Sequence, residues 1–312
     1  MNKIVITGGL GFIGVNTAIR FINKGLDVII IDNMSRKGAD LNYEFLKENF
    51  RDKFKIENID VRNFNDLIRV FKENANIKAV YHFAAQVAVT TSVIDPREDF
   101  EINAIGTFNI LECIRLYSPE SIIVYSSTNK VYGGMEDKII ELRDDRYCYK
   151  DFPFGIDEGT CLDFHSPYGC SKGAADQYIR DYHRIYNIKS VVFRQSCIYG
   201  IRQFGIEDQG WVAWFTIAAM LNKQITVYGD GKQVRDVLFI DDLVDLYESV
   251  IDKIDQVNGD VFNIGGGHEN VMSLLNLLSY LEEYLGKNIT YKVSDWRPGI
   301  NRYSTSFVRD EI

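Results

Sequence analysis

The glycine-rich segment TGGLGFIG, Thr7 to Gly14, constrains the fold of this chain more than any other stretch. A short apolar run, Lys3 to Thr7, precedes it, and a helical pattern of apolar residues follows at once. Gly9, Gly11 and Gly14 match G-x-G-x-x-G, whose glycines allow a tight turn and close backbone approach to a pyrophosphate at a helix N-terminus. A plain glycine turn would explain the motif alone, but its place at a strand–helix junction favours a dinucleotide site.

The next strand-like run bears on the choice between NAD and NADP. Asp27 to Ile31 ends in Asp32, 18 residues after Gly14. An acidic side chain there hydrogen-bonds a ribose 2′-hydroxyl and repels a 2′-phosphate, which favours NAD. Arg36 and Lys37 follow closely, and basic residues at this corner could instead accept a 2′-phosphate. We expect NAD on balance.

Strand-like and helix-like segments alternate along most of the chain. We expect strands near 54–59, 79–83, 121–125 and 190–193, and a long helix over about 97–117. This order predicts an α/β fold with a Rossmann-type, doubly wound parallel sheet. Ligands of such sheets lie beyond the carboxyl ends of the strands, so the polar residues of 82–86 and 126–128 are candidates for the site.

The remaining segments predict a smaller C-terminal α/β domain. We place an NAD-binding Rossmann domain at 1–195 plus 234–264, and a nucleotide-sugar-binding domain at 196–233 plus 265–312. Residues 133–166 show no clear period and are rich in tyrosine, aspartate, phenylalanine and glycine. Stretches of this length without regular structure are commonly lids or binding loops, so we expect that role here.

The pair Tyr168 and Lys172, in SPYGCSK, is the strongest candidate for acid–base chemistry. Four residues apart on a helix, the two side chains share one face. Tyr43 and Tyr228 also have a lysine four residues on, but only Tyr168 follows Ser-Pro and precedes an amphipathic helix. An ammonium about 4–5 Å from a phenol lowers the phenol pKa by roughly 2–3 units, so we expect Tyr168 to act as a base near neutral pH.

Composition narrows the function classes. The net charge of -9 argues against a nucleic-acid or anionic-membrane partner. The five cysteines include no C-x-x-C pair, as is typical of reduced cytoplasmic thiols, and the four dispersed histidines argue against a metal site. No signal peptide is evident, and the longest apolar run, Trp211 to Leu221, is too short to span a bilayer. We therefore expect a cytoplasmic protein without a metal ion.

Six motifs in order resemble the extended short-chain dehydrogenase/reductase (NAD-dependent epimerase/dehydratase) family of nucleotide-sugar enzymes. They are TGGLGFIG, HFAAQ, YSSTNKVYG, SPYGCSK, VRDVLFIDDL and FNIGGG. The resemblance implies that Thr128 hydrogen-bonds the substrate oxygen and that Tyr168 is the general base. It implies that Lys172 holds the nicotinamide ribose and lowers the tyrosine pKa. Asn103 would either pack the long helix or contact substrate.

The resemblance also implies two groups of binding residues. The substrate group would hold the sugar and its diphosphate, the diphosphate through guanidinium groups suited to phosphate geometry. Its members are Gln86, Thr128, Asn129, Arg235 and Arg297. The NAD group comprises Gly8, Gly11, Phe12, Ile13, Gly14, Asp32, Asn33, Ser35, Arg36, Asp60, Val61, Phe83, Ala84, Ala85, Gln86, Ser126, Tyr168 and Lys172.

The two residues after Thr128 bear on the reaction. A dehydratase of this family carries Asp-Glu there, whereas this chain has Asn129 and Lys130. Elimination then lacks its acid and base, which favours an isomerase that epimerises by transient oxidation to a ketone. The chain is most similar to the carbon-2 epimerases of CDP-linked 3,6-dideoxyhexoses, which serve lipopolysaccharide O-antigen biosynthesis. The alternatives are a UDP-hexose 4-epimerase and a non-catalytic NAD-binding protein.

The resemblance bears finally on assembly and on the end of the chain. It implies a homodimer or homotetramer that packs through helices. Family members continue with another strand and helix beyond the position of Ile312, and Ile300 stands where the family usually has an acidic residue. We therefore expect a substrate domain that is truncated at its C-terminus.

Overall fold

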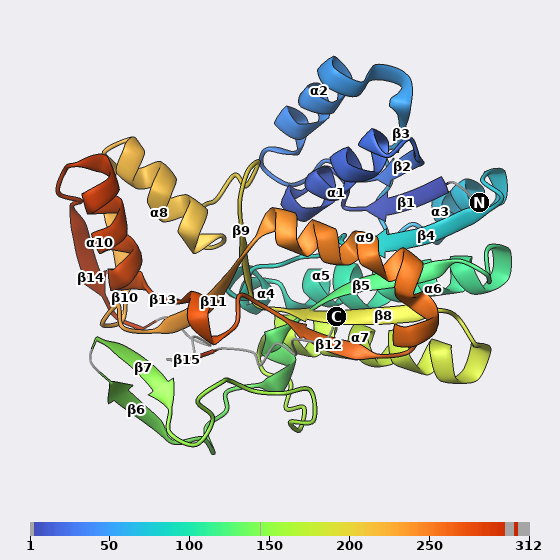
Figure 1. The fold of residues 1–312 in the computed structure, drawn as a ribbon. Helices are drawn as coiled ribbons and strands as arrows, with labels where there is room; N and C mark the ends of the chain where they lie inside the picture. Colours follow the sequence, from blue (N-terminus) through green and yellow to red (C-terminus); the bar gives the residue numbers. More distant parts are fainter. Residues whose placement is uncertain (1–2, 144, 297–302, 305–312) are drawn as a thin grey trace.

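Seven parallel strands form the large sheet of the molecule (Figure 1). A computed structural model describes residues 3–143, 145–296 and 303–304. The strand order is β12-β8-β5-β4-β1-β2-β3. Successive strands are added on one side of β1 up to β3 and on its other side from β4 onward, which confirms the doubly wound, Rossmann-type sheet expected from the sequence. The bounds are β1 (Lys3–Thr7), β2 (Asp27–Ile31), β3 (Phe54–Glu57), β4 (Ile77–His82), β5 (Ile122–Thr128), β8 (Ser190–Gln195) and β12 (Val261–Ile264).

The two faces of this sheet carry different helices because side chains alternate along each strand. Ile4 and Ile6 of β1 join one buried cluster, and Val5 between them joins another. Burial on both faces explains why these strands read as continuous apolar runs in the sequence. The first cluster includes α1 (Phe12–Asn23), α2 (Ala39–Phe50) and α9 (Ile240–Val257), and the second α3 (Phe64–Glu73), α6 (Gly106–Tyr117) and α7 (Ser166–Tyr186).

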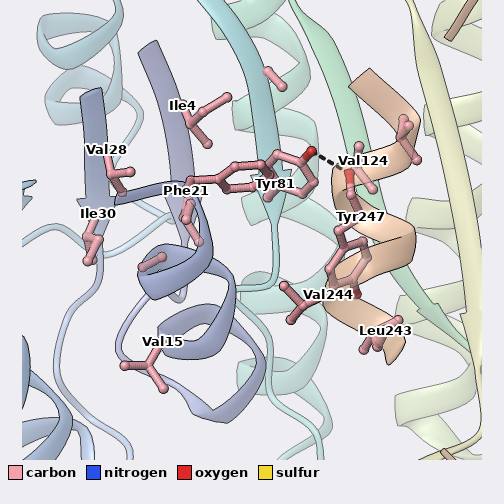
Figure 2. Packing of buried hydrophobic residues seen from close by; sticks show 14 of the residues in the cluster. Ile4, Val15, Phe21, Val28, Ile30, Tyr81, Val124, Leu243, Val244 and Tyr247 are labelled. Carbon is pink, nitrogen blue, oxygen red and sulfur yellow. Dashed lines mark hydrogen bonds between the residues drawn. The ribbon is translucent and has the colours of Figure 1, made fainter. Parts of the chain in front are cut away.

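Aromatic rings join α1, β4 and α9 on the first face (Figure 2). The Tyr81 ring centroid lies 5.0 Å from that of Phe21 on α1 and 5.7 Å from that of Tyr247 on α9. The Tyr81 hydroxyl donates to the backbone oxygen of Tyr247 at 2.7 Å, which satisfies a buried polar group. α9 is thereby fixed against the large sheet.

A smaller lobe lies beyond the carboxyl ends of the large sheet, at the left of Figure 1. Apolar side chains of α8 (Trp211–Met220), α10 (Leu274–Leu285) and β10 (Ile225–Tyr228) form its core, and β14 (Tyr291–Ser294) pairs with β10. A second sheet of the lobe contains β9 (Cys197–Tyr199), β11 (Val234–Phe239), β13 (Val271–Ser273) and β15 (Tyr303–Ser304). β11 thus pairs within the smaller lobe, although we assigned its residues to the Rossmann domain, and the domain boundaries stay a prediction.

Residues 133–166 contain a β-hairpin that we did not predict. β6 (Ile140–Arg143) and β7 (Arg146–Tyr149) pair antiparallel. Tyr149 of this hairpin and Ile156 beyond it are buried in a cluster with Val234 of β11. Each strand has only four residues, which is too short to give a readable period. A lid role for this segment stays a prediction.

The long helix expected over 97–117 is interrupted. α4 (Val89–Ile94) and α5 (Pro96–Phe100) precede a π-helical turn, η2 (Glu101–Ile105), which continues into α6. Such turns insert one residue into a helix and often occur at functional sites. Three short 3-10 helices complete the elements of the described residues: η1 (Arg51–Lys53), η3 (Asn129–Tyr132) and η4 (His268–Asn270).

Candidate functional site

The glycine turn between β1 and α1 forms a cradle that fits a pyrophosphate. Gly8 has a φ of +66°, and a Cβ there would lie 2.7 Å from the backbone nitrogen of Ala84. A Cβ at Gly14 would lie 2.2 Å from the backbone oxygen of Gly8, so only glycine permits this close approach. No side chain caps α1, which leaves the N–H groups of its first turn to an anion.

Two carboxylates lie where the adenosine end of a dinucleotide would bind. Asp32, directly after β2, is buried and accepts a hydrogen bond from the backbone nitrogen of Leu10 at 2.9 Å, while burial raises its pKa. Asp60 accepts hydrogen bonds from Asn33 at 2.8 Å and from the Arg62 side chain, which lowers the Asp60 pKa to about 2. A carboxylate at this place would fit a ribose hydroxyl and repel a phosphate.

One cavity of about 720 Å³ brings the predicted residues together. Its volume is within the usual range of small-molecule sites. It runs from the glycine turn past the end of β5 to the smaller lobe. Arg297 lies outside the described residues. The predicted residues that line the cavity are Gly8, Gly11, Phe12, Ile13, Gly14, Asp32, Asn33, Ser35, Arg36, Asp60, Val61, Phe83, Ala84, Ala85, Gln86, Ser126, Thr128, Asn129, Tyr168, Lys172 and Arg235.

Thr128, Tyr168 and Lys172 meet at the carboxyl end of β5. Thr128 is the last residue of β5, and α7 begins two residues before Tyr168 with Pro167 in its first turn, where proline is favoured. A hydrogen bond joins the side chains of Tyr168 and Thr128. Lys172, one turn further along α7, is buried and donates to the backbone oxygen of Ser126 at 2.5 Å. A substrate hydroxyl between Thr128 and Tyr168 would meet both a hydrogen-bond partner and a proton acceptor.

The electrostatic part of the Tyr168 prediction is wrong for this structure. Burial raises the pKa of Tyr168 to about 12, and the nearby Asp99 carboxylate adds to the rise. The hydrogen bond with Thr128 and the charge of Arg36 act in the opposite direction. Lys172 is not among the groups that lower the pKa of this phenol.

The direction of the Lys172 side chain explains this correction. Its ammonium binds the backbone oxygen of Ser126 and lies 4.2 Å from the centroid of the Tyr125 ring. Burial lowers the pKa of Lys172 to about 7, against the opposing charges of Asp176 and Asp99. Spacing along a helix places two residues on one face, but it does not determine where a long side chain points.

A buried network below Tyr168 is absent from the sequence prediction. Asp99 accepts hydrogen bonds from the Ser171 hydroxyl at 2.5 Å and from the Gln86 amide at 2.8 Å. Asn103 donates to the Ser171 hydroxyl at 3.0 Å and accepts from the backbone nitrogen of Gln86 at 2.9 Å. The network ties α5 and the π-helical turn to α7, the helix that carries Tyr168. The sequence contained one sign of this network, because Asp99 lies four residues before Asn103, one helical turn away.

This network bears on the roles expected for two residues. Asn103 is 1% exposed, which favours the packing role over substrate contact. Gln86 lines the cavity, but its side-chain nitrogen donates to Asp99 and to the backbone oxygen of Ala88, and its side-chain oxygen accepts from the Ala88 backbone nitrogen at 2.6 Å. Both ends of the Gln86 side-chain amide therefore form hydrogen bonds within the protein.

Arg36 crosses the cavity. It follows β2 in the Rossmann layers, and its guanidinium donates to the side-chain oxygen of Gln209, in the segment before α8. Both residues line the cavity, and Gln209 was not among the predicted residues. Arg36 was expected to act only at the cofactor's ribose, yet its charge also lowers the pKa of Tyr168. Long-range pairing of this kind leaves no local sequence signal.

The end of the cavity near the smaller lobe combines predicted and unpredicted residues. Asn129 and Arg235 line it as expected for the substrate group, and Lys130 and Cys197 lie with them. From the sequence, Lys130 was considered only because it stands where a dehydratase has a carboxylate. Its position in the cavity with Arg235 was not predicted.

Three further observations limit the site. His82, one of the polar residues near the strand ends, lies in the core, where Thr7 and Thr107 bind its ring at 2.6 and 2.9 Å and burial lowers its pKa to about 3. The described residues contain no cluster of histidine, cysteine and carboxylate side chains that could hold a metal ion. Within the same part of the chain, every helix is too short or too polar to cross a bilayer.

Comparison with known proteins identifies relatives of the whole chain. A CDP-paratose 2-epimerase of Salmonella typhi is 46% identical over 305 residues, which cover 95% of this chain and 89% of the relative. A UDP-glucose 4-epimerase of Bacillus subtilis is 30% identical over 315 residues, which cover 95% of this chain and 86% of the relative.

Solved structures of sugar-nucleotide epimerases have a similar fold. The solved structure of a UDP-glucuronic acid 4-epimerase from Bacillus cereus, in complex with UDP-glucuronic acid and NAD, matches with a TM-score of 0.82 at 27% identity and covers 98% of this chain and 90% of that one. Residues 4–265 match the family described as NAD dependent epimerase/dehydratase. The chain therefore belongs to the NAD dependent epimerase/dehydratase family.

Proposed function

We propose that this protein epimerises a CDP-linked 3,6-dideoxyhexose at carbon 2 and so interconverts CDP-paratose and CDP-tyvelose. The observation that carries the proposal is the 46% identity to a CDP-paratose 2-epimerase over 95% of the chain. The relatives whose names include UDP-glucose 4-epimerase, one of them named as putative, are more distant, at 29–31% identity. Asn129 and Lys130 in place of a carboxyl pair disfavour dehydration. Such a reaction would supply a sugar for lipopolysaccharide O-antigen.

The chain's own residues have separate tasks in this reaction. The glycine turn and the start of α1 would hold the pyrophosphate of NAD, and Asp32 its adenosine ribose. NAD, when bound, supplies reversible hydride transfer. Thr128 would hold the carbon-2 oxygen, and Tyr168 would accept the proton from that oxygen. Tyr168 would return the proton after the sugar ketone has rotated within the site to present its other face.

The pKa of Tyr168, at about 12, is too high for a base near neutral pH. A cationic group beside the phenol would lower it. The nicotinamide ring of bound NAD would be such a group. Lys172 would hold it there through its ribose, since the Lys172 side chain is buried one helical turn from Tyr168. The base role of Tyr168 therefore depends on the loaded site rather than on Lys172 alone.

The test offers the purified protein CDP-paratose and, separately, UDP-glucose, with the products identified by NMR. We expect inversion at carbon 2 of the CDP sugar and no conversion of UDP-glucose. The matched variant Tyr168→Phe should lose turnover while it still binds NAD. Inversion of UDP-glucose at carbon 4 would point to the UDP-hexose 4-epimerase, and no conversion of either sugar to a binding protein without chemistry.

We also propose a homodimer that packs through α6 and α7. Both helices expose apolar side chains at one place: Phe108 of α6 is 38% exposed and Tyr178 of α7 is 50% exposed, and their rings lie 5.7 Å apart. Ile105 and Ile185 extend this face. Light scattering of the purified protein should give twice the chain mass or a larger multiple, and Phe108→Glu should shift it towards the monomer.

The cytoplasm is the proposed location. All five cysteines are free thiols, as is typical of a reducing compartment. Fractionation of the native cells should recover the protein with cytoplasmic markers. Recovery with a secreted or membrane fraction would contradict this assignment.

A further inference from the structure

Lys130 is a basic residue at the end of the cavity near the smaller lobe. No step of the proposed reaction uses it. It is the second residue of η3, which begins directly after Thr128, and its backbone nitrogen donates to the Thr128 hydroxyl oxygen at 3.3 Å. Lys130 lines the same cavity as Thr128 and Tyr168. Thr128 and Lys130 are thus joined by one short turn.

The turn that carries Lys130 is firmly held. The Lys130 backbone oxygen accepts from the nitrogen of Gly133 at 3.2 Å, and a Cβ at Gly169 of α7 would lie 3.2 Å from the same oxygen. α7 therefore packs directly against η3, one residue after Tyr168. The base on α7 and the cation on η3 have a fixed relation to each other.

Charge makes Lys130 a candidate ligand for an anion. The groups that act on its ammonium are the guanidinium of Arg235 and the thiol of Cys197, and no carboxylate among the described residues neutralises it. Burial, and then repulsion by Arg235, lower the pKa of Lys130 to about 7. An anion between Lys130 and Arg235 would relieve that repulsion. The nucleotide sugar of the proposed function carries such an anion, its diphosphate.

We infer that Lys130 binds the sugar-linked phosphate of the substrate beside Arg235 and thereby places carbon 2, rather than carbon 4, at Tyr168. This inference rests on the proposed function. Carbon 2 is bonded to the carbon that carries the phosphate, whereas carbon 4 lies on the far side of the sugar ring. A phosphate ligand only two residues from Thr128 fits the shorter of these separations. Lys130 is then a positioning residue that determines specificity.

The test compares CDP, which contains the second phosphate, with CMP, which lacks it. Isothermal titration of the wild type and of Lys130→Met measures both affinities. Loss of one charge-assisted contact should weaken CDP binding about 10- to 100-fold and leave CMP binding within about twofold. Lys130→Arg keeps the charge and should recover most of the CDP affinity. NAD affinity, measured on each variant, should stay unchanged because Lys130 is not among the residues that would hold NAD.

Proton uptake provides a second readout. A phosphate that binds Lys130 raises its pKa above about 7, so CDP binding should take up a proton at a pH near 8. Titrations in buffers of different ionisation enthalpy would detect this uptake in the wild type. Lys130→Met should abolish it, while CMP should show none in either protein.

Three results would overturn the inference. Equal effects of Lys130→Met on CDP and CMP, or no effect on CDP, would remove the phosphate contact. A weaker CDP affinity with kcat for carbon-2 epimerisation unchanged would remove the positioning role, which predicts that kcat falls as well as that KM rises. If the wild type does not epimerise CDP-paratose, the proposed function fails, while the comparison of CDP with CMP still decides whether Lys130 binds phosphate.

Discussion

The buried ion pair between Arg194 of β8 and Asp176 of α7 should be critical for stability. The guanidinium donates to both carboxylate oxygens, at 2.9 and 3.1 Å, and the two side chains are 2% and 0% exposed. Arg194 also donates to the Tyr132 hydroxyl at 3.0 Å, and Asp176 accepts from the Ser127 hydroxyl at 2.8 Å. The pair therefore joins α7 to the large sheet and to η3. Arg194→Met removes the cation and keeps most of the volume.

The expected loss is large because the carboxylate stays buried. Breaking a buried ion pair by removing one partner costs about 3–5 kcal/mol. Ser127 still donates to Asp176, which argues for the lower half of that range. The total stability of a folded protein is about 5–15 kcal/mol, so the variant loses a substantial part of it. Its urea midpoint should fall in proportion.

The assay is urea unfolding followed by circular dichroism, with the double variant Arg194→Met, Asp176→Leu as the matched control. Replacing both partners removes the buried charge, so the double variant should recover most of the loss and retain a deficit of about 1 kcal/mol from the unpaired Ser127 hydroxyl. A single variant within about 1 kcal/mol of the wild type, or a double variant no more stable than the single one, would refute this reasoning.

Two further predictions concern the site. Asp99→Asn removes a negative charge that raises the pKa of both Tyr168 and Lys172. Both pKa values should then fall, and both limbs of the pH profile of kcat/KM should move to lower pH; an unmoved profile would contradict the placement of Asp99. Gly14→Ala places a methyl group 2.2 Å from a backbone oxygen, an overpacking of about 1–3 kcal/mol, so NAD affinity should fall at least about fivefold in a titration of the folded variant. Unchanged NAD affinity would place the pyrophosphate elsewhere.

Local patterns predicted the parts of this structure that depend on local interactions. The glycine turn, the strand ending in Asp32 and the helix of Tyr168 each follow from a short run of residues. Strand-like and helix-like segments alternate along the chain, and that pattern predicted the large sheet. Because the carboxyl ends of parallel strands meet at one edge, the same pattern also brought Thr128 to the glycine turn.

The parts that local patterns missed depend on contacts between distant segments. Arg36 meets Gln209 across 173 positions of the chain, and Ser171 meets Asp99 across 72. The direction of Lys172 is set by the end of β5, which no helix spacing encodes. The π-helical turn rotates the apolar face of the helix after it, and the composition of the segment does not reveal this rotation. The short strands of 133–166 are too brief for a period to appear.

In the proposed reaction, hydride leaves and returns at carbon 2 of one sugar while Tyr168 accepts the proton and gives it back. CDP-paratose labelled with deuterium at carbon 2 tests it most directly, with the product analysed by NMR after turnover in ordinary water. We expect CDP-tyvelose that keeps the deuterium at carbon 2 with inverted configuration, and no product from Tyr168→Phe. Replacement of the label by solvent hydrogen, or inversion at another carbon, would contradict it.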